Sequence, residues 1–64
     1  MKYAYFVSFT YASDTEKSPI DNTIITVDGQ INTVADVENL ESAISQKTGK
    51  IEVTAIYFKL LGKA

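Results

Sequence analysis

The residue types that most enzymes use for chemistry are scarce in this chain of 64 residues. The sequence contains no His to act as a general base and no Cys to form a thiolate, so its Ser and Thr hydroxyls lack the usual means of activation. A pair such as Ser8 and Lys59 is conceivable, but no spacing marks these two residues as partners. We therefore expect no catalytic residues and predict that the protein is not an enzyme.

Two pairs of carboxylates have spacings that acid–base catalysis could use: Asp14 with Glu16, and Glu38 with Glu41. The first pair, together with Asp21 and Asn22, could also offer oxygen ligands to a hard cation. The first pair lies in a polar segment that lacks the fixed pattern of an EF-hand loop. The second pair has the spacing of neighbours on a solvated helix face. The three Gly are isolated from one another, so no Gly-rich phosphate-binding loop is present. The sequence therefore predicts no metal site and no cofactor.

Aromatic side chains are the feature that points to binding. We take five of them as candidate binding residues: Tyr3, Tyr5, Phe6, Tyr11 and Tyr57. Such rings stack on nucleobases, and they also fill cores and interfaces. All six cations are scattered Lys residues and the net charge is −2, which disfavours nucleic acid as a partner. Core and interface packing is the preferred interpretation, and stacking of a nucleotide-like ligand between protomers and single-stranded nucleic-acid binding are the alternatives.

The elements that must position these rings follow from hydrophobic periodicity. Residues 1–12 place Tyr3, Tyr5, Val7, Phe9 and Tyr11 at period two, which predicts a strand, although the alternate positions also include a Phe. A polar segment over 12–19 predicts a long loop, and the β-branched run 20–27 predicts a second strand.

A helix and a third strand follow in the second half of the chain. Val34, Val37, Leu40 and Ile44 form one helical stripe, Thr33 with Asp36 resembles a capping box, and Gly49 is a helix stop. Residues 50–61 then predict a strand that becomes apolar on both faces.

The order strand, strand, helix, strand predicts an α+β fold with a single domain over residues 1–64. A right-handed crossover sets the third strand beside the first, which gives a three-stranded antiparallel sheet with the first strand in the centre and the helix on one face. We expect Val7 and Phe9 beneath the helix and Phe6 on the open face. One helix covers only one side of such a sheet, so we expect an apolar patch on the other side.

The size of the chain favours self-association. A domain of this length buries only ~60% of the surface of its unfolded chain, and the absence of Cys and His removes disulfides and the usual zinc ligands. We therefore predict a homo-oligomer, most simply a homodimer. The sequence has neither a secretory leader pattern nor a segment of ~20 apolar residues, so we expect no membrane contact and a cytoplasmic location.

Three segments, residues 1–11, 34–41 and 53–61, together resemble small uncharacterised proteins of Gram-positive phages and prophages that open on a similar Met-Lys-Tyr-x-Tyr-Phe-Val-Ser-Phe pattern. The resemblance spans nearly the whole chain but lies in pattern rather than in a catalytic motif. It implies a protein of a mobile genetic element that acts in a host cell by compact binding, such as modulating a host protein or sequestering a small signal. We therefore expect a small non-enzymatic protein that binds a host protein through its sheet face.

Overall fold

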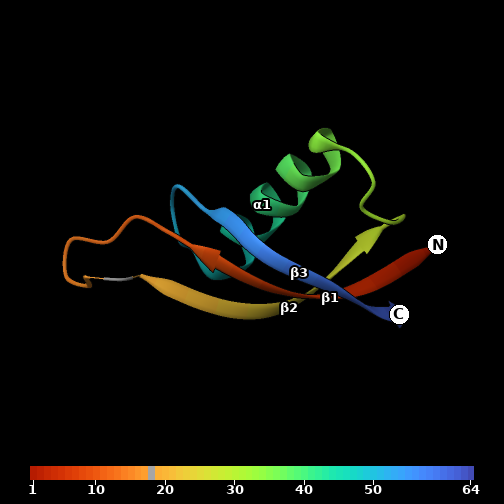
Figure 1. The fold of residues 1–64 in the computed structure, drawn as a ribbon, viewed down its shortest axis with the longest axis horizontal. Coiled ribbons are helices and arrows are strands. Elements are labelled where there is room, and N and C mark those ends of the chain that lie inside the picture. The colour runs from red at the N-terminus through yellow and green to blue at the C-terminus, as the bar shows by residue number, and fades with distance from the viewer. Residues whose placement is uncertain (18) are drawn as a thin grey trace.

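The computed structural model describes residues 1–17 and 19–64. Ser18, in the predicted loop 12–19, lies outside the described residues. The described residues form four elements: β1 (Lys2–Thr10), β2 (Ile20–Asp28), α1 (Val34–Thr48) and β3 (Thr54–Lys63). The strands make one antiparallel sheet in the order β2-β1-β3, and α1 lies across one face of it (Figure 1). The predicted α+β fold in ββαβ order, with the first strand central, is confirmed.

β1 divides its side chains between the two faces of the sheet. Its odd-numbered residues point toward α1, where Val7 and Phe9 are fully buried, and its even-numbered residues, including Phe6, point to the opposite face. Leu40 and Ile44 of α1 pack onto this buried side and complete the core. The predicted orientation of the sheet is therefore confirmed.

The helix begins and ends where the sequence predicts. The Thr33 side chain accepts a hydrogen bond from the Asp36 N–H and the Asp36 carboxylate accepts one from the Thr33 N–H, which is a complete capping box. Gly49 ends the helix with a φ of 76°, a left-handed conformation that a residue with a Cβ adopts at a cost. Of the predicted stripe, Leu40 and Ile44 are buried, while Val34 in the first turn is exposed.

The third strand begins and ends later than predicted. Residues 50–53 are not part of a strand, and the chain bends at Ile51 and Glu52, with Glu52 at a φ of 52°. The Ile51 carbonyl accepts a hydrogen bond from the Ala12 N–H at 2.9 Å. β3 begins at Thr54 and ends at Lys63, so it includes Gly62 and Lys63, which the sequence predicted to be part of a tail. The Ala64 N–H donates to the Lys2 carbonyl at 3.0 Å, so the ladder with β1 reaches the last residue.

The molecule is elongated, with extents of 38 × 20 × 17 Å. Both termini lie at one end, and the described residues of the connection between β1 and β2 extend beyond the helix at the other end (Figure 1). The helix of the described residues lacks the length and the apolar character needed to cross a bilayer.

Candidate interaction surface

The five candidate aromatic residues lie on two different faces of the sheet. Tyr3, Tyr5 and Tyr11 are on the side of α1, where Tyr5 is 3% exposed and Tyr11 is 9% exposed. Phe6 and Tyr57 lie on the opposite face, which we call the open face, with ring centroids 6.5 Å apart and ring planes at 64°. The structure therefore brings two of the five rings together on one accessible surface and places two others in the core.

Tyr5 has a structural role at the junction of core and loop. Its hydroxyl accepts a hydrogen bond from the Ile31 N–H at 2.9 Å, which attaches the segment before α1 to the central strand. Its ring meets the Phe58 ring edge to face, with centroids 6.0 Å apart. This side chain therefore connects β1 to both the loop and β3.

Tyr11 attaches the long loop and the end of the helix to β1. Its hydroxyl donates to the Glu16 carboxylate at 2.5 Å, and the Lys50 ammonium lies 4.4 Å from its ring centroid. The hydrogen bond to Glu16 raises the pKa of Tyr11 above its usual value, and partial desolvation and the nearby charges of Glu16 and Asp21 act in the same direction. Tyr11 is therefore held as a neutral phenol within a local network.

The open face carries isolated apolar side chains among polar ones. Ile20 and Ile24 of β2 are each 55% exposed, and Phe6 and Tyr57 form the aromatic pair beside them. Polar residues occupy other positions of this face in the register: Ser8, Thr10, Asn22, Thr26 and Lys59. In the described part of the chain no element covers this face, which Figure 1 shows on the side of the sheet away from α1. The surface is mixed in character, not a continuous apolar layer.

β3 exposes more apolar surface than the rest of the sheet, and it does so on both of its faces. Phe58 and Leu60 pair with Val7 and Tyr5 and therefore lie on the helix side, whereas Tyr57 lies on the open face. Five apolar side chains of this strand are between 39% and 54% exposed: Ile56, Tyr57, Phe58, Leu60 and Leu61. We call these five the β3 edge set. The candidate list from sequence included only Tyr57 of them, although the apolar run on both faces was the signal that could have identified the others.

The hydrogen bonds of β1 determine which backbone groups of the outer strands remain free. The Tyr11 N–H donates to the Pro19 carbonyl at 3.1 Å, and the Gly29 N–H donates to the Met1 carbonyl at 3.0 Å. Because an antiparallel strand alternates its bonds between its two neighbours, the odd-numbered residues of β1 bond to β2 and the even-numbered residues bond to β3.

This alternation directs the backbone of Phe58 outward. Tyr57 and Lys59 pair with the even-numbered residues Ser8 and Phe6, so their N–H and C=O groups point toward β1. Phe58 lies between them, and its N–H and C=O groups therefore point away from β1 toward the outer edge of the sheet.

The two outer edges of the sheet differ in how far side chains cover them. On β2, the Lys47 ammonium donates to the outward carbonyl of Ile24. On β3, the Glu41 carboxylate accepts a hydrogen bond from the Ala55 N–H at 2.8 Å. Beyond Ala55, no side chain of the described residues bonds to the backbone of β3, so residues 56–63 present a bare edge.

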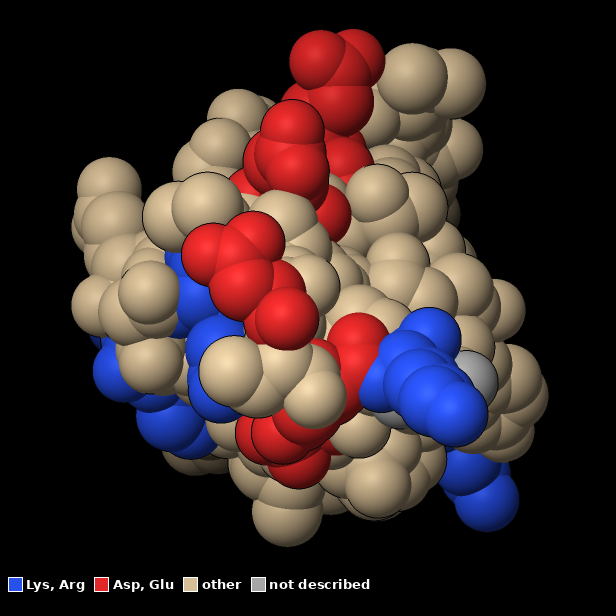
Figure 2. Space-filling model, turned by 90° about the vertical axis from the view of Figure 1, so that its left-hand side faces the viewer, with Lys and Arg blue, Asp and Glu red and all other residues tan. Residues whose placement is uncertain are grey.

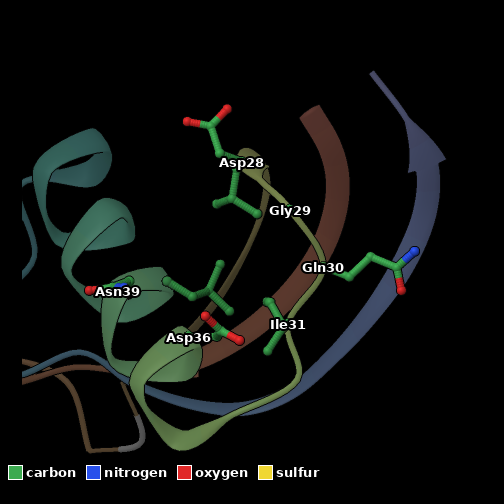
Figure 3. Close-up of a pocket in the computed structure, with 8 residues that line it drawn as sticks. Asp28, Gly29, Gln30, Ile31, Asp36 and Asn39 are labelled. Atoms are coloured by element: carbon green, nitrogen blue, oxygen red, sulfur yellow. The ribbon is translucent and has the colours of Figure 1, made fainter. Parts of the chain in front are cut away.

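A cavity of about 240 Å³ lies between α1 and the loop that precedes it (Figure 3). It is lined by Val27, Asp28, Gly29, Gln30, Ile31, Asp36, Asn39 and Leu40. The Asp36 carboxylate already accepts hydrogen bonds from the N–H groups of Asn32 and Thr33 at 3.0 and 3.1 Å. The other carboxylate that lines the cavity, that of Asp28, lies 3.2 Å from the Lys2 ammonium. Both carboxylates therefore already have partners, and the volume of the cavity is below the ~300 Å³ of the smallest ordinary ligand sites.

Charged side chains form no single basic surface at the loop end of the molecule. Figure 2 shows Asp and Glu side chains in a band across this end, with Lys side chains on either side of them. Such a mixed surface gives no continuous track for a phosphate backbone.

Comparison of the chain with family models, with curated proteins and with solved structures found no match.

Proposed function

We propose that this chain is a small non-enzymatic interaction protein that associates with itself and binds a protein partner through its sheet. One observation carries the proposal: a single helix covers one face of the sheet, and the five apolar side chains of the β3 edge set remain substantially exposed. Clusters of exposed apolar side chains on a small protein are typical of protein–protein contacts.

The nature of the surface supports a protein as the partner. The open face combines the Phe6–Tyr57 ring pair with Ile24 and with neutral polar side chains such as Ser8 and Asn22. This mixture of aromatic, aliphatic and neutral polar groups is that of protein interfaces, which are depleted in charge at their centre. The resemblance to small phage and prophage proteins supports a host protein as this partner and the host cytoplasm as the place of binding.

The proposal is tested by comparing the mass in solution and the binding of matched variants. Sedimentation of the wild-type chain over a range of concentrations measures self-association, and we expect a mass above that of the monomer. Ile24→Glu places a charge on the open face, while Val34→Glu places the same charge at an exposed apolar residue of the helix, away from the sheet.

We expect host proteins retained by the immobilised wild-type chain to be retained by Val34→Glu and lost by Ile24→Glu. A wild-type chain that remains monomeric at every concentration contradicts the self-association. Equal retention by both variants contradicts the use of the open face.

A further inference from the structure

We propose that a second copy of this chain docks on the outer edge of β3, so that two β3 strands pair antiparallel and the two sheets become one sheet of six strands. This inference rests on the self-association proposed above and assigns it to one surface. The occupant is a second copy because the exposed edge, its charges and its area are those that a symmetric pair requires.

The backbone of β3 has the groups that a new strand needs. Phe58 directs its N–H and C=O groups outward from the sheet. The register with β1 shifts on either side of residues 57–60, so these four residues form a regular stretch between two irregularities. Two copies related by a two-fold axis can therefore pair at the regular stretch, with each Phe58 exchanging two hydrogen bonds with its counterpart.

The opposite edge of the sheet is the less suitable one. On β2, Ile24 also directs its backbone groups outward, but its carbonyl already accepts a hydrogen bond from Lys47. Asp21 and Asp28 add charge near the two ends of this strand. Charges and occupied carbonyls are the devices that keep an edge strand from pairing with another chain.

Charge selects the register of the β3 pair. A two-fold axis through Lys59 places two ammonium groups directly opposite each other, which is unfavourable. An axis through Phe58 places each Lys59 opposite the partner's Tyr57 on the open face, where a cation and an aromatic ring attract each other. Lys59 is the one charge of residues 54–62, so no other like-charge contact arises along the pair.

The exposed area is sufficient for a weak dimer. A Phe or Tyr side chain has about 150–250 Å² of surface, so five half-exposed apolar side chains offer about 500 Å² per copy. Two copies can then bury at most about 1,000 Å² of side-chain surface, which is close to the lower limit for a biological interface and in the range of transient contacts. We therefore expect association that depends on protein concentration.

Single cysteines test the register, because the natural chain has no Cys and any disulfide must join two copies. With Phe58 on the two-fold axis, the two Cα atoms at this position lie about 5.5 Å apart, which a disulfide can bridge. Leu60→Cys is the control on the same strand, since its two copies lie about 13 Å apart along the pair. Ile24→Cys is the control on the other edge.

Under mild oxidation at equal concentration we expect Phe58→Cys to become mostly covalent dimer and both controls to remain mostly monomer. Dimers of Ile24→Cys in place of Phe58→Cys overturn the choice of edge. Dimers of Leu60→Cys in place of Phe58→Cys overturn the choice of register.

A backbone substitution tests the edge without changing a side chain. The 64-residue chain is short enough for chemical synthesis, and an N-methyl group at Phe58 removes the outward N–H while leaving the hydrogen bonds to β1 in place. Symmetry removes two hydrogen bonds from the dimer, so we expect its Kd to rise about 100-fold, at about tenfold for each bond. The same N-methyl group at Ile24, outward on the other edge, is the matched control and leaves Kd unchanged.

Circular dichroism of both synthetic chains confirms that they fold, and the cysteine experiment remains decisive if either does not. A wild-type chain that stays monomeric overturns the proposed self-association itself. A different result would overturn only the assignment to β3: the wild-type chain associates, N-methylation at Phe58 leaves the Kd of the dimer unchanged, and Ile24→Glu raises it. That result would place the contact on the open face.

Discussion

Two tyrosines, Tyr5 in β1 and Tyr11 directly after it, show how residues of one type take different roles at neighbouring points of the chain. Tyr5 and Tyr11 lie on the same side of the sheet because they are an even number of residues apart, and each buries its ring in the core. Their hydroxyls then bond to different partners, Ile31 in the loop before α1 and Glu16 in the loop after β1. Each hydroxyl therefore attaches a different connection to the central strand.

Tyr5→Phe removes the acceptor for the Ile31 N–H and leaves that partly buried donor without a partner. An unsatisfied donor of this kind costs about 1 kcal/mol, so we expect the free energy of unfolding, measured by urea titration, to fall by this amount. Tyr57→Phe is the matched control: Tyr57 is exposed, so its change lies within ~0.5 kcal/mol. Equal effects of the two substitutions contradict this role for the Tyr5 hydroxyl.

Asp36 makes the stability of the fold depend on pH in the acidic range. The N–H of Asn32 above all, and then the side chain and N–H of Thr33, hold the pKa of Asp36 below its ordinary value of 3.8. The unfolded chain therefore binds this proton more readily than the folded chain, and the contribution of Asp36 to stability is complete above pH 3.8. It is lost progressively as the pH falls below that value toward the folded-state pKa. We expect thermal unfolding measured from neutral pH down through this range to show the loss in the wild type and a smaller one in Asp36→Asn.

At the level of elements, the helix could be predicted from sequence and the start of β3 could not. The signals at Thr33, Asp36 and Gly49 act through neighbouring backbone groups, so they are visible in the sequence and they place both helix ends correctly. The bend before β3 depends on a long-range hydrogen bond between Ala12 and Ile51, which no local pattern encodes.

The candidate surface could also be predicted only in part: its β1 residues could, and its β3 residues could not. Period two in β1 correctly placed Phe6 on the open face, because a strand alternates strictly. In β3 the apolar residues occupy both faces and two register shifts interrupt the alternation, so periodicity could not show which residues α1 leaves exposed.

The helix stripe separates in the structure into buried and exposed positions, and this gives a further prediction. Ile44 is fully buried against the sheet, so Ile44→Ala removes core contacts and should lower the free energy of unfolding by about 2–5 kcal/mol. Val34 belongs to the same stripe in sequence but is exposed, so Val34→Ala should change it by less than about 0.5 kcal/mol. Denaturant titration of both variants provides the measurement. A similar loss in both contradicts the placement of the first helical turn outside the core.

At the scale of the whole molecule, folding and association are expected to be coupled. A chain of this size has a small core, which here consists of one helix packed on one face of the sheet. Any copy that docks on β3 binds the folded chain and not the unfolded one, because the paired backbone groups and the side chains of the β3 edge set are aligned only in the sheet. Association therefore adds to the stability of the fold by mass action.

This coupling predicts that the melting temperature of the wild-type chain rises with protein concentration. A tenfold rise in concentration favours a dimer by about 1.4 kcal/mol, shared by two chains, which for a domain of this length corresponds to a few degrees in Tm. Circular dichroism in cells of different path length measures Tm across the series. In the chain with an N-methyl group at Phe58, the rise in Tm should begin only at concentrations about 100-fold higher, because the loss of two hydrogen bonds weakens the β3 pair by that factor. A wild-type Tm that does not move with concentration contradicts the coupling, because a dimer that forms only from folded chains must stabilise them.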